Sequence, residues 1–196
     1  MKRLSRKYKI VFLEGSRLFL RPLEEGDINR RYLSWLNDRE VTRYMDAGAF
    51  PTVLEDLRAF YRKMRNSNTG VLLAIVEKKN NKFIGTIKLG NISWVHRYAE
   101  MAIMIGDKRY WGRGYAQEAG KLMLEYAFLK LNLNKVFLGV YVNHKAAVRT
   151  YKRLSFQIEG RLKKIGNFDG KYVDCLYMGM LRSEFEMSRK KYYVSN

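Results

Sequence analysis

The stretch Arg109–Ala119 carries the residues of this sequence that are best suited to bind an anion. Gly112 and Gly114 stand one residue apart in it, arginines flank them, and a helical pattern of apolar residues follows. Free backbone N–H groups meet at the start of a helix, where the helix dipole adds about half a positive charge. Because glycine has no Cβ, the backbone can approach an anion closely. The pattern predicts a pyrophosphate site, with a tight turn that binds nothing as the alternative.

Two common phosphate-binding loops do not fit this stretch. A P-loop has a lysine and a serine or threonine after its second glycine, whereas Tyr115 and Ala116 stand there. The dinucleotide-binding fingerprint has glycine or alanine where Gln117 stands, and an acidic residue about 20 residues later. Residues 132–135 of this chain offer no acidic side chain at that place. The glycine loop therefore belongs to neither class.

Apolar periodicity predicts the elements that precede this loop. Alternation favours strands at residues 17–23, 71–77, 82–92 and 99–105, of which the second and third form a hairpin. A helix is expected to begin at Asp27, which would cap it. A second helix is expected over residues 52–64, where Thr52 and Glu55 have the spacing of a capping box.

The elements after the loop alternate between helix and strand. Apolar residues from Ala116 to Leu131 mark one face of a long helix. A strand is expected at residues 135–142, a helix at 144–154, and two closing strands at 156–164 and 172–181. No stretch resembles a linker between domains. The order predicts a one-domain α/β (α+β) chain around a mixed, largely antiparallel sheet.

Composition limits the class of protein. A chain of 196 residues that is 47% hydrophobic with two prolines is expected to fold as one globular domain. Cys175 is the only cysteine, so no internal disulfide can form, which fits a cytoplasmic location. The apolar run at residues 10–13 is too short for a signal peptide, and no stretch is long enough to insert in a membrane. The sequence has no Cys/His cluster of the kind that binds a metal.

The net charge points to anionic partners. The chain carries a formal charge of +19, with its densest basic runs near its two ends. Such a charge favours nucleic acid, anionic lipid or phosphorylated small molecules, although a solvated basic surface is an equal alternative.

The glycine loop resembles a motif of the GNAT acetyltransferase superfamily. Residues 109–116 fit its pattern Arg/Gln-x-x-Gly-x-Gly/Ala, and the sequence looks most like the branch of ribosomal-protein N-terminal and diamine acetyltransferases. The resemblance runs from about Leu18 to Phe185 and includes stretches 17–27, 32–45, 143–163 and 168–181. It implies a twisted sheet of about seven strands flanked by four helices. The expected domain spans residues 15–185, between a basic extension at 1–14 and a basic tail at 186–196.

The resemblance implies acetyl-CoA as the donor of an acetyl group. The pyrophosphate of acetyl-CoA would lie on the amides from Gly112 to Ala116. The pantetheine arm would pair with the strand at residues 103–105, which splays away from the neighbouring strand. The side chains of that strand are expected in the core, with its backbone binding the arm. The residues implied in donor binding are Ile103, Met104, Ile105, Arg109, Gly112, Arg113, Gly114, Tyr115, Ala116 and Asn143.

Two residues, Tyr151 and Glu100, are candidates for the acyl-transfer chemistry, and Asn143 is a candidate for binding the pantetheine arm. Tyr151 matches the family tyrosine that donates a proton to the thiolate, although it could be a core aromatic. Asn143 matches a family asparagine, but it lies eight residues before Tyr151 rather than seven, so His144 has the usual spacing and Asn143 could be a helix cap. Glu100 is the candidate general base, directly or through water, with a surface carboxylate as the alternative.

Four further residues have secondary interpretations. His96 is the second candidate for the base, and Trp94 beside it could form a wall of the acceptor pocket. Asp174 and Glu159 are expected to be structural.

The acceptor is predicted from charge alone. A chain at +19 repels free polyamines at long range, which favours an amine attached to an anion, such as a nucleotide-linked amino sugar. Acetylation of a ribosomal or other protein N-terminus, or of a polyamine, is the alternative. A non-catalytic RNA- or ribosome-binding module is a further alternative, and nucleic acid is not expected as the primary partner. The sequence leaves open whether the protein is a monomer or a dimer.

Overall fold

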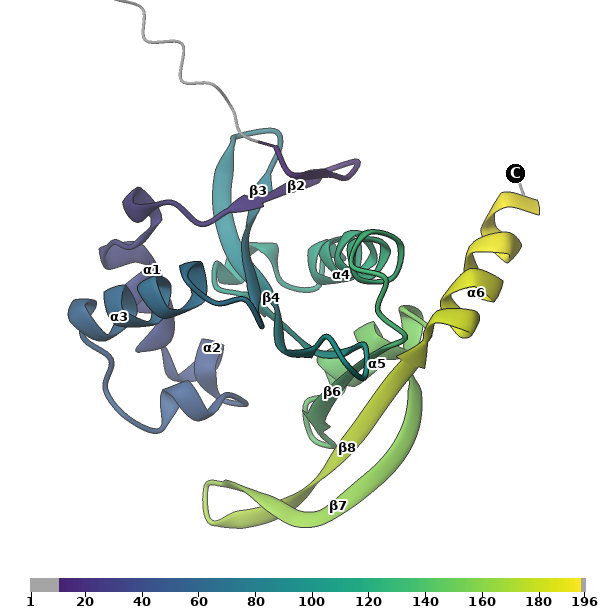
Figure 1. Cartoon of the computed structure of the whole chain (residues 1–196). Helices are drawn as coiled ribbons and strands as arrows, with labels where there is room; N and C mark the ends of the chain where they lie inside the picture. The colour runs from purple at the N-terminus through teal and green to yellow at the C-terminus, as the bar shows by residue number, and fades with distance from the viewer. Residues whose placement is uncertain (1–10, 195–196) are drawn as a thin grey trace, which may run out of the picture.

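The computed structural model describes residues 11–194. Within these residues, the protein is built on one sheet of eight strands in the order β1-β2-β3-β4-β5-β6-β8-β7 (Figure 1). Neighbouring strands are antiparallel except for β5 and β6, which run parallel. The strands are β1 Leu13–Glu14, β2 Leu18–Pro22, β3 Val71–Glu77, β4 Lys82–Ser93, β5 Tyr98–Ile105, β6 Lys135–Tyr141, β7 Gln157–Phe168 and β8 Lys171–Leu181.

Helices cover both faces of this sheet. The helices are α1 Arg30–Leu36, α2 Arg39–Thr42, α3 Leu54–Arg65, α4 Tyr115–Glu125, α5 Lys145–Arg153 and α6 Arg182–Val194. One core lies under α1 and α3 and contains Phe19, Val76 and Met104. The larger core lies under α4 and α5 and contains Ile75, Met101 and other side chains of the opposite face. The mixed α/β fold expected from the sequence is confirmed.

The numbers of strands and helices differ from those expected. The sheet gains an eighth strand because the two residues of β1 pair with Leu20 and Phe19 of β2, a pairing too short to leave a periodic pattern. The described residues form six α-helices rather than four, since α2 is a single short turn and α6 occupies much of the stretch expected to be a tail. Residues 1–10 of the basic extension and 195–196 of the tail lie outside the described residues, and the domain boundaries stay predictions.

The expected start of the first helix at Asp27 is wrong. The Arg21 guanidinium binds both carboxylate oxygens of Asp27, at 2.6 and 2.8 Å. This ion pair holds Asp27 in a short 3-10 turn before the helix. Asn29 caps α1 instead, because its Oδ1 accepts hydrogen bonds from the backbone N–H groups of Arg31 and Tyr32.

The capping box expected at Thr52 and Glu55 is displaced by one residue. Helix α3 begins after Val53, whose backbone N–H donates to Oδ2 of Asp56 at 2.9 Å. The N–H of Thr52 donates instead to Oδ1 of Asn37 in the preceding loop. A contact with a distant segment therefore sets the start of this helix.

The parallel junction between β5 and β6 divides the sheet in two. Only the pairs Tyr98–Lys135, Ala99–Val136 and Glu100–Phe137 join the two strands. Beyond Glu100, β5 continues to Ile105 in register with β4, and β6 continues to Tyr141 in register with β8. The two strands therefore part after the third pair, which leaves the remaining β6-facing edge of β5 without a strand partner.

The chain after the glycine loop is helical to Lys130, as expected. Helix α4 ends at Glu125, and a π-helical segment over Tyr126–Lys130 continues it. Among residues 11–194, no helix is both long and apolar enough to cross a membrane.

Candidate active site

The glycine loop has the geometry of an anion site. Gly112 and Gly114 have φ values of 69° and 79°, in the left-handed region that favours glycine, and Gly114 is the N-cap of α4. The N–H of Glu118 donates to the Gly114 carbonyl and starts the helical ladder. Within the described part of the chain, the N–H groups of residues 112–117 make no hydrogen bond. These groups can therefore donate to a bound phosphate.

Arg109 does not reach over this loop. Its Nε and Nη2 bind the two carboxylate oxygens of Asp107 at 2.9 and 2.8 Å. Arg31 and Lys82 also contact Asp107, at 2.9 and 3.4 Å. The Arg109 guanidinium is the main cause of a pKa of Asp107 far below its usual range. Arg109 therefore serves an ion-pair cluster in this structure, and any contact with a phosphate would require its side chain to turn.

Arg17 and Glu118 join the glycine loop to the turn between β1 and β2, and sequence reasoning missed both. Glu118 accepts hydrogen bonds from the backbone N–H and the Nε of Arg17, at 2.7 and 2.9 Å. Burial raises the pKa of Glu118, but the hydrogen bonds from Arg17 and Ser16 outweigh burial and leave the pKa below its usual value. The two residues lie about a hundred positions apart, so no local pattern reveals the pair.

The strand expected to bind the pantetheine arm borders the gap between β5 and β6. Met104 is buried against the α1 and α3 face, and Ile103 and Ile105 pack on the opposite core. The Ile105 carbonyl accepts a hydrogen bond from Nε1 of Trp111 at 2.6 Å. This hydrogen bond engages one backbone acceptor of β5, at the end of the strand that lies near the glycine loop.

Asn143 presents a polar atom that the described residues leave without a partner. Its Oδ1 is buried and makes no hydrogen bond with the described residues. An unpaired buried acceptor costs about 1–3 kcal/mol, so a ligand that donates to it would be favoured. The N-cap of α5 is His144 rather than Asn143, and it makes no capping bond with its side chain. The alternative of Asn143 as a helix cap is therefore wrong.

His144 packs against the loop after α2. Its ring stacks on Tyr44 with centroids 4.2 Å apart, and burial lowers its pKa. Tyr44 also contacts Phe168 at the end of β7, at 5.2 Å between centroids. The His144 side chain is thus committed to an aromatic cluster, whereas the buried oxygen of Asn143 is free to accept.

Tyr151 lies in the core between α5 and the sheet. The residue is 9% exposed, and its ring meets Phe156 edge-on with centroids 5.9 Å apart. Burial raises the pKa of Tyr151 to about 12. The hydroxyl therefore stays protonated at neutral pH, as a proton donor must.

Glu100 lies on the other face of the sheet. Its neighbours Ala99 and Met101 point into the core under α4 and α5, so alternation directs Glu100 to the face of α1 and α3. Its Oε2 accepts a hydrogen bond from Nδ2 of Asn91 at 3.0 Å. The structure thus places Glu100 and Tyr151 on opposite faces of the sheet, with Glu100 in the last pair that joins β5 to β6.

The four secondary candidates lie at the edge of the candidate site or outside it. His96 and Trp94 are exposed in the turn between β4 and β5, where Trp94 donates to the Asn68 carbonyl at 2.8 Å. Asp174 pairs with Arg161 and Glu159 with Lys135, at 2.5 and 2.7 Å, in keeping with structural roles.

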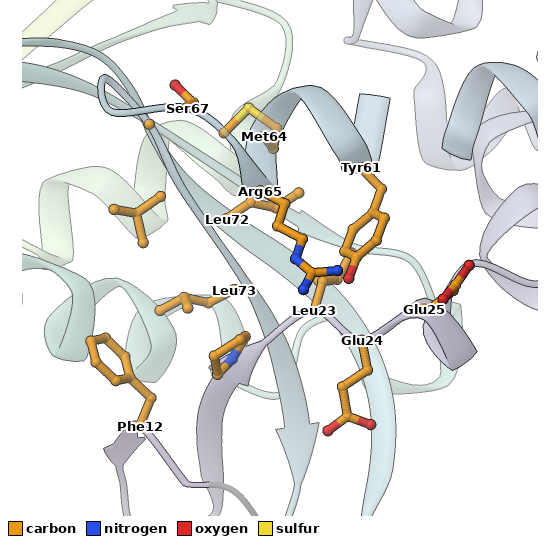
Figure 2. A pocket seen from close by; sticks show the side chains of 13 residues that line it. Phe12, Leu23, Glu24, Glu25, Tyr61, Met64, Arg65, Ser67, Leu72 and Leu73 are labelled. Carbon is orange, nitrogen blue, oxygen red and sulfur yellow. The ribbon is translucent and has the colours of Figure 1, made fainter. Parts of the chain in front are cut away.

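A cavity of about 540 Å³ lies away from these residues (Figure 2). Figure 2 shows Tyr61 and Arg65 of α3 reaching over Leu23, with Phe12 on the opposite side. None of the residues expected in catalysis or donor binding lines this cavity.

Comparisons with known proteins agree on one family. Residues 17–157 match the model of the acetyltransferase (GNAT) domain. The spermidine N(1)-acetyltransferase of Vibrio cholerae serotype O1 is 32% identical over 172 residues, which cover 87% of this chain and 96% of the relative. The corresponding enzyme of Escherichia coli K12 is 33% identical over 87% of this chain and 89% of the relative.

A solved structure resembles the fold just described. The crystal structure of spermidine N-acetyltransferase from Vibrio cholerae in complex with CoA and spermine has a TM-score of 0.79 and 30% identity. The match covers 86% of this chain and 98% of that one.

A putative ribosomal N-acetyltransferase of Bacillus subtilis is 27% identical over 69% of this chain and 70% of the relative. The chain described here belongs to the GNAT family and is an acetyl-CoA-dependent N-acetyltransferase.

Proposed function

We propose that this enzyme transfers the acetyl group of acetyl-CoA to a primary amine of a polyamine. The observation that carries the proposal is the gap where β5 and β6 part, since Glu100 is in the last pair before it and β5 leads from it to the glycine loop. The choice of acceptor is supported by the names of the relatives from Vibrio cholerae and Escherichia coli.

The residues around the gap fit a CoA-type donor, which supplies an activated acetyl thioester. Its diphosphate would accept hydrogen bonds from the N–H groups of residues 112–117. The buried oxygen of Asn143 would accept a hydrogen bond from an amide of the pantetheine arm. Both are groups that the described part of the protein leaves without partners.

The two faces of the sheet suit the two proton transfers of the reaction. An ammonium group has no free electron pair, so the acceptor must lose a proton before it can attack a carbonyl. Glu100 would accept that proton on the face of α1 and α3. Tyr151 would donate its proton to the leaving thiolate on the face of α4 and α5.

The comparisons give no support to a nucleotide-linked amino sugar as the acceptor. That expectation used the net charge of +19 of the whole chain, including residues at its two ends. Charges farther away than about 8 Å are largely screened at physiological salt, so the groups beside the acceptor decide its binding. Glu100 is such a group, and its carboxylate favours a cation.

A panel of acceptors tests the proposed function. Steady-state release of free thiol from acetyl-CoA would be measured with spermidine, a nucleotide-linked amino sugar and a peptide with a free N-terminus. Spermidine is expected to give the highest kcat/KM. A higher value for either of the other acceptors at physiological salt would overturn the polyamine assignment while leaving the acetyltransferase activity intact.

Lys88 is expected to weaken the binding of a polycation. Thr86 pairs with Met104, which is buried under α1 and α3, so alternation along β4 places Lys88 on the same face as Glu100. Its Cε lies 3.9 Å from the point that a Cβ on Gly90 would occupy, and Gly90 pairs with Glu100. Lys88→Glu should raise kcat/KM for spermidine about fivefold, which corresponds to about 1 kcal/mol for a partly screened pair.

A neutral variant separates charge from shape in this experiment. Lys88→Met keeps most of the side chain and should give a smaller increase in kcat/KM than Lys88→Glu. Equal values for the two variants, or a decrease with Lys88→Glu, would contradict a charge effect at the acceptor.

Asn143→Ala should weaken acetyl-CoA binding without weakening the fold. The variant loses one hydrogen bond to the donor, worth about 1 kcal/mol, so calorimetry should show about a fivefold higher Kd. Because the substitution removes a buried oxygen that has no partner among residues 11–194, Tm should stay equal or rise. A lower Tm with an unchanged Kd would show that Asn143 is structural.

A further inference from the structure

Arg17 holds one peptide of the glycine loop in a fixed orientation. Its Nη1 donates a hydrogen bond to the carbonyl oxygen of Arg113 at 2.8 Å. The same guanidinium lies over the ring of Tyr115, 4.8 Å from its centroid. Its Nη2 lies 3.3 Å from the point that a Cβ on Gly114 would occupy. The guanidinium therefore bonds to Arg113 and lies over Tyr115, beside Gly114.

Glu118 fixes Arg17 in this position. One oxygen of its carboxylate accepts from the backbone N–H groups of Arg17 and Leu18, at 2.7 and 3.3 Å, and from Oγ of Ser16 at 3.1 Å. The other oxygen binds Nε of Arg17 at 2.9 Å. Because Nε is held by Glu118, the Nη groups of the planar guanidinium extend toward Arg113 and Gly114.

The direction of a carbonyl determines the direction of the next N–H group. In a trans peptide, the C=O of one residue and the N–H of the next point in opposite directions. The Arg113 carbonyl points to Arg17, so the N–H of Gly114 points away from it. This N–H has no hydrogen-bond partner within residues 11–194.

The side of α4 opposite to Arg17 faces β5, the strand whose edge borders the gap, and the end of α5. Glu118 marks the side that faces β2, through its bonds to Arg17 and Leu18. Gly120 follows about 200° later around the helix and lies against Ile103 of β5 and Leu154 at the end of α5. An N–H that points away from Arg17 is thus directed to the side on which the donor would lie.

Glycine at position 114 makes this orientation easy to lose. Its φ of 79° is unfavourable for other residues, but glycine adopts positive and negative φ about equally well. Rotation of the peptide between Arg113 and Gly114 would therefore cost little by itself. A rotated peptide would present its carbonyl oxygen, rather than its N–H, to an anion.

We propose that Arg17, positioned by Glu118, prevents rotation of the Arg113–Gly114 peptide and thereby keeps the Gly114 N–H available to the CoA diphosphate. Arg17 is a positioning residue, since it contacts the loop from the side away from the gap. The inference rests on the proposed placement of the diphosphate on residues 112–117.

The orientation of the peptide can be measured without turnover. In ligand-free protein, the Gly114 amide should give a sharp ¹⁵N resonance in the native chain. In Arg17→Ala it should show exchange broadening on the microsecond to millisecond timescale, as two peptide orientations interconvert. A sharp, unshifted Gly114 resonance in Arg17→Ala would overturn the proposal.

Binding measurements provide the second readout. Calorimetry should give a Kd for CoA that is five- to tenfold higher in Arg17→Ala, and KM for acetyl-CoA should rise more than kcat falls. Arg17→Lys should recover part of the affinity, because a lysine can still donate one bond to the Arg113 carbonyl. Glu118→Gln should give an intermediate Kd, because it keeps the acceptor oxygen but loses the ion pair.

Arg62→Ala is the matched control for charge. Arg62 is exposed on α3, and its contact with Glu55 is weak at 3.7 Å. The variant should leave the Kd for CoA unchanged, and an equal increase in both alanine variants would overturn the proposal in favour of a general charge effect. Unchanged affinity in Gly114→Glu would instead overturn the placement of the diphosphate, so the two failures can be distinguished.

Discussion

Tyr151→Phe should lower kcat by about a hundredfold, because it removes the proposed proton donor while keeping the aromatic ring. The ring packs against Phe156 and the core under α5, so the fold and the affinity for acetyl-CoA should stay close to native. Steady-state kinetics would give kcat, and calorimetry would give the Kd for acetyl-CoA.

The pH dependence follows from the burial of this tyrosine. Burial raises the pKa of Tyr151 to about 12, so the hydroxyl keeps its proton throughout the usual assay range. The native kcat should therefore show no alkaline decline due to Tyr151 below that value. Because the unfolded tyrosine loses its proton near pH 10, the contribution of this group to stability falls as the pH rises above about 10.

A second tyrosine serves as the control. Tyr126 is partly buried against the same core and contacts Phe12, and no proposed contact of donor or acceptor involves it. Tyr126→Phe should leave kcat unchanged. Full kcat in Tyr151→Phe would assign Tyr151 to packing alone.

Gly114→Glu should raise the Kd for acetyl-CoA at least tenfold, or about 1.4 kcal/mol. The substitution adds a negative charge beside the proposed diphosphate. It also forces a side chain into a backbone with a φ of 79°, close to the Arg17 guanidinium. Both effects act on the N–H groups at the start of α4, and calorimetry with the folded variant would measure the loss.

Gly170→Glu separates the local effect from backbone strain. Gly170 lies in the turn between β7 and β8, has a φ of 77°, and has open space where a Cβ would be. This variant introduces the same charge and a similar strain away from the glycine loop. It should leave the Kd for acetyl-CoA unchanged, and an equal loss of affinity in both variants would refute the proposed phosphate site.

Local sequence patterns predicted much of the sheet and less of the helix boundaries. The predicted limits of residues 71–77 agree with β3, because this strand alternates toward two cores and turns end it on both sides. The helix starts at Asp27 and Thr52 were wrong because Arg21 and Asn37, outside those helices, bind them. Such contacts with neighbouring elements outweigh local capping preferences.

The sequence predicted the loop of the candidate site better than its surroundings. A short motif marks Gly112 and Gly114, and its positive φ values agree with that pattern. The pairing of Arg17 with Glu118 and the stacking of Tyr44 on His144 join segments far apart in the chain. A single sequence carries no sign of these contacts, which the fold alone creates. The roles of Tyr151, Glu100 and the donor-binding residues stay predictions.

The three-pair junction between β5 and β6 also bears on how the protein folds. Strands β2 to β5 pair with their neighbours through mostly local connections, except for the long one between β2 and β3, and β7 and β8 form a hairpin of their own. Pairings between sequence neighbours close small loops, so we expect them to form before the parallel junction, which requires α4 to cross between the halves. The gap proposed to hold the donor lies at this seam. Binding of acetyl-CoA therefore requires that the two halves of the sheet have packed together, and a partly folded chain would not bind the donor.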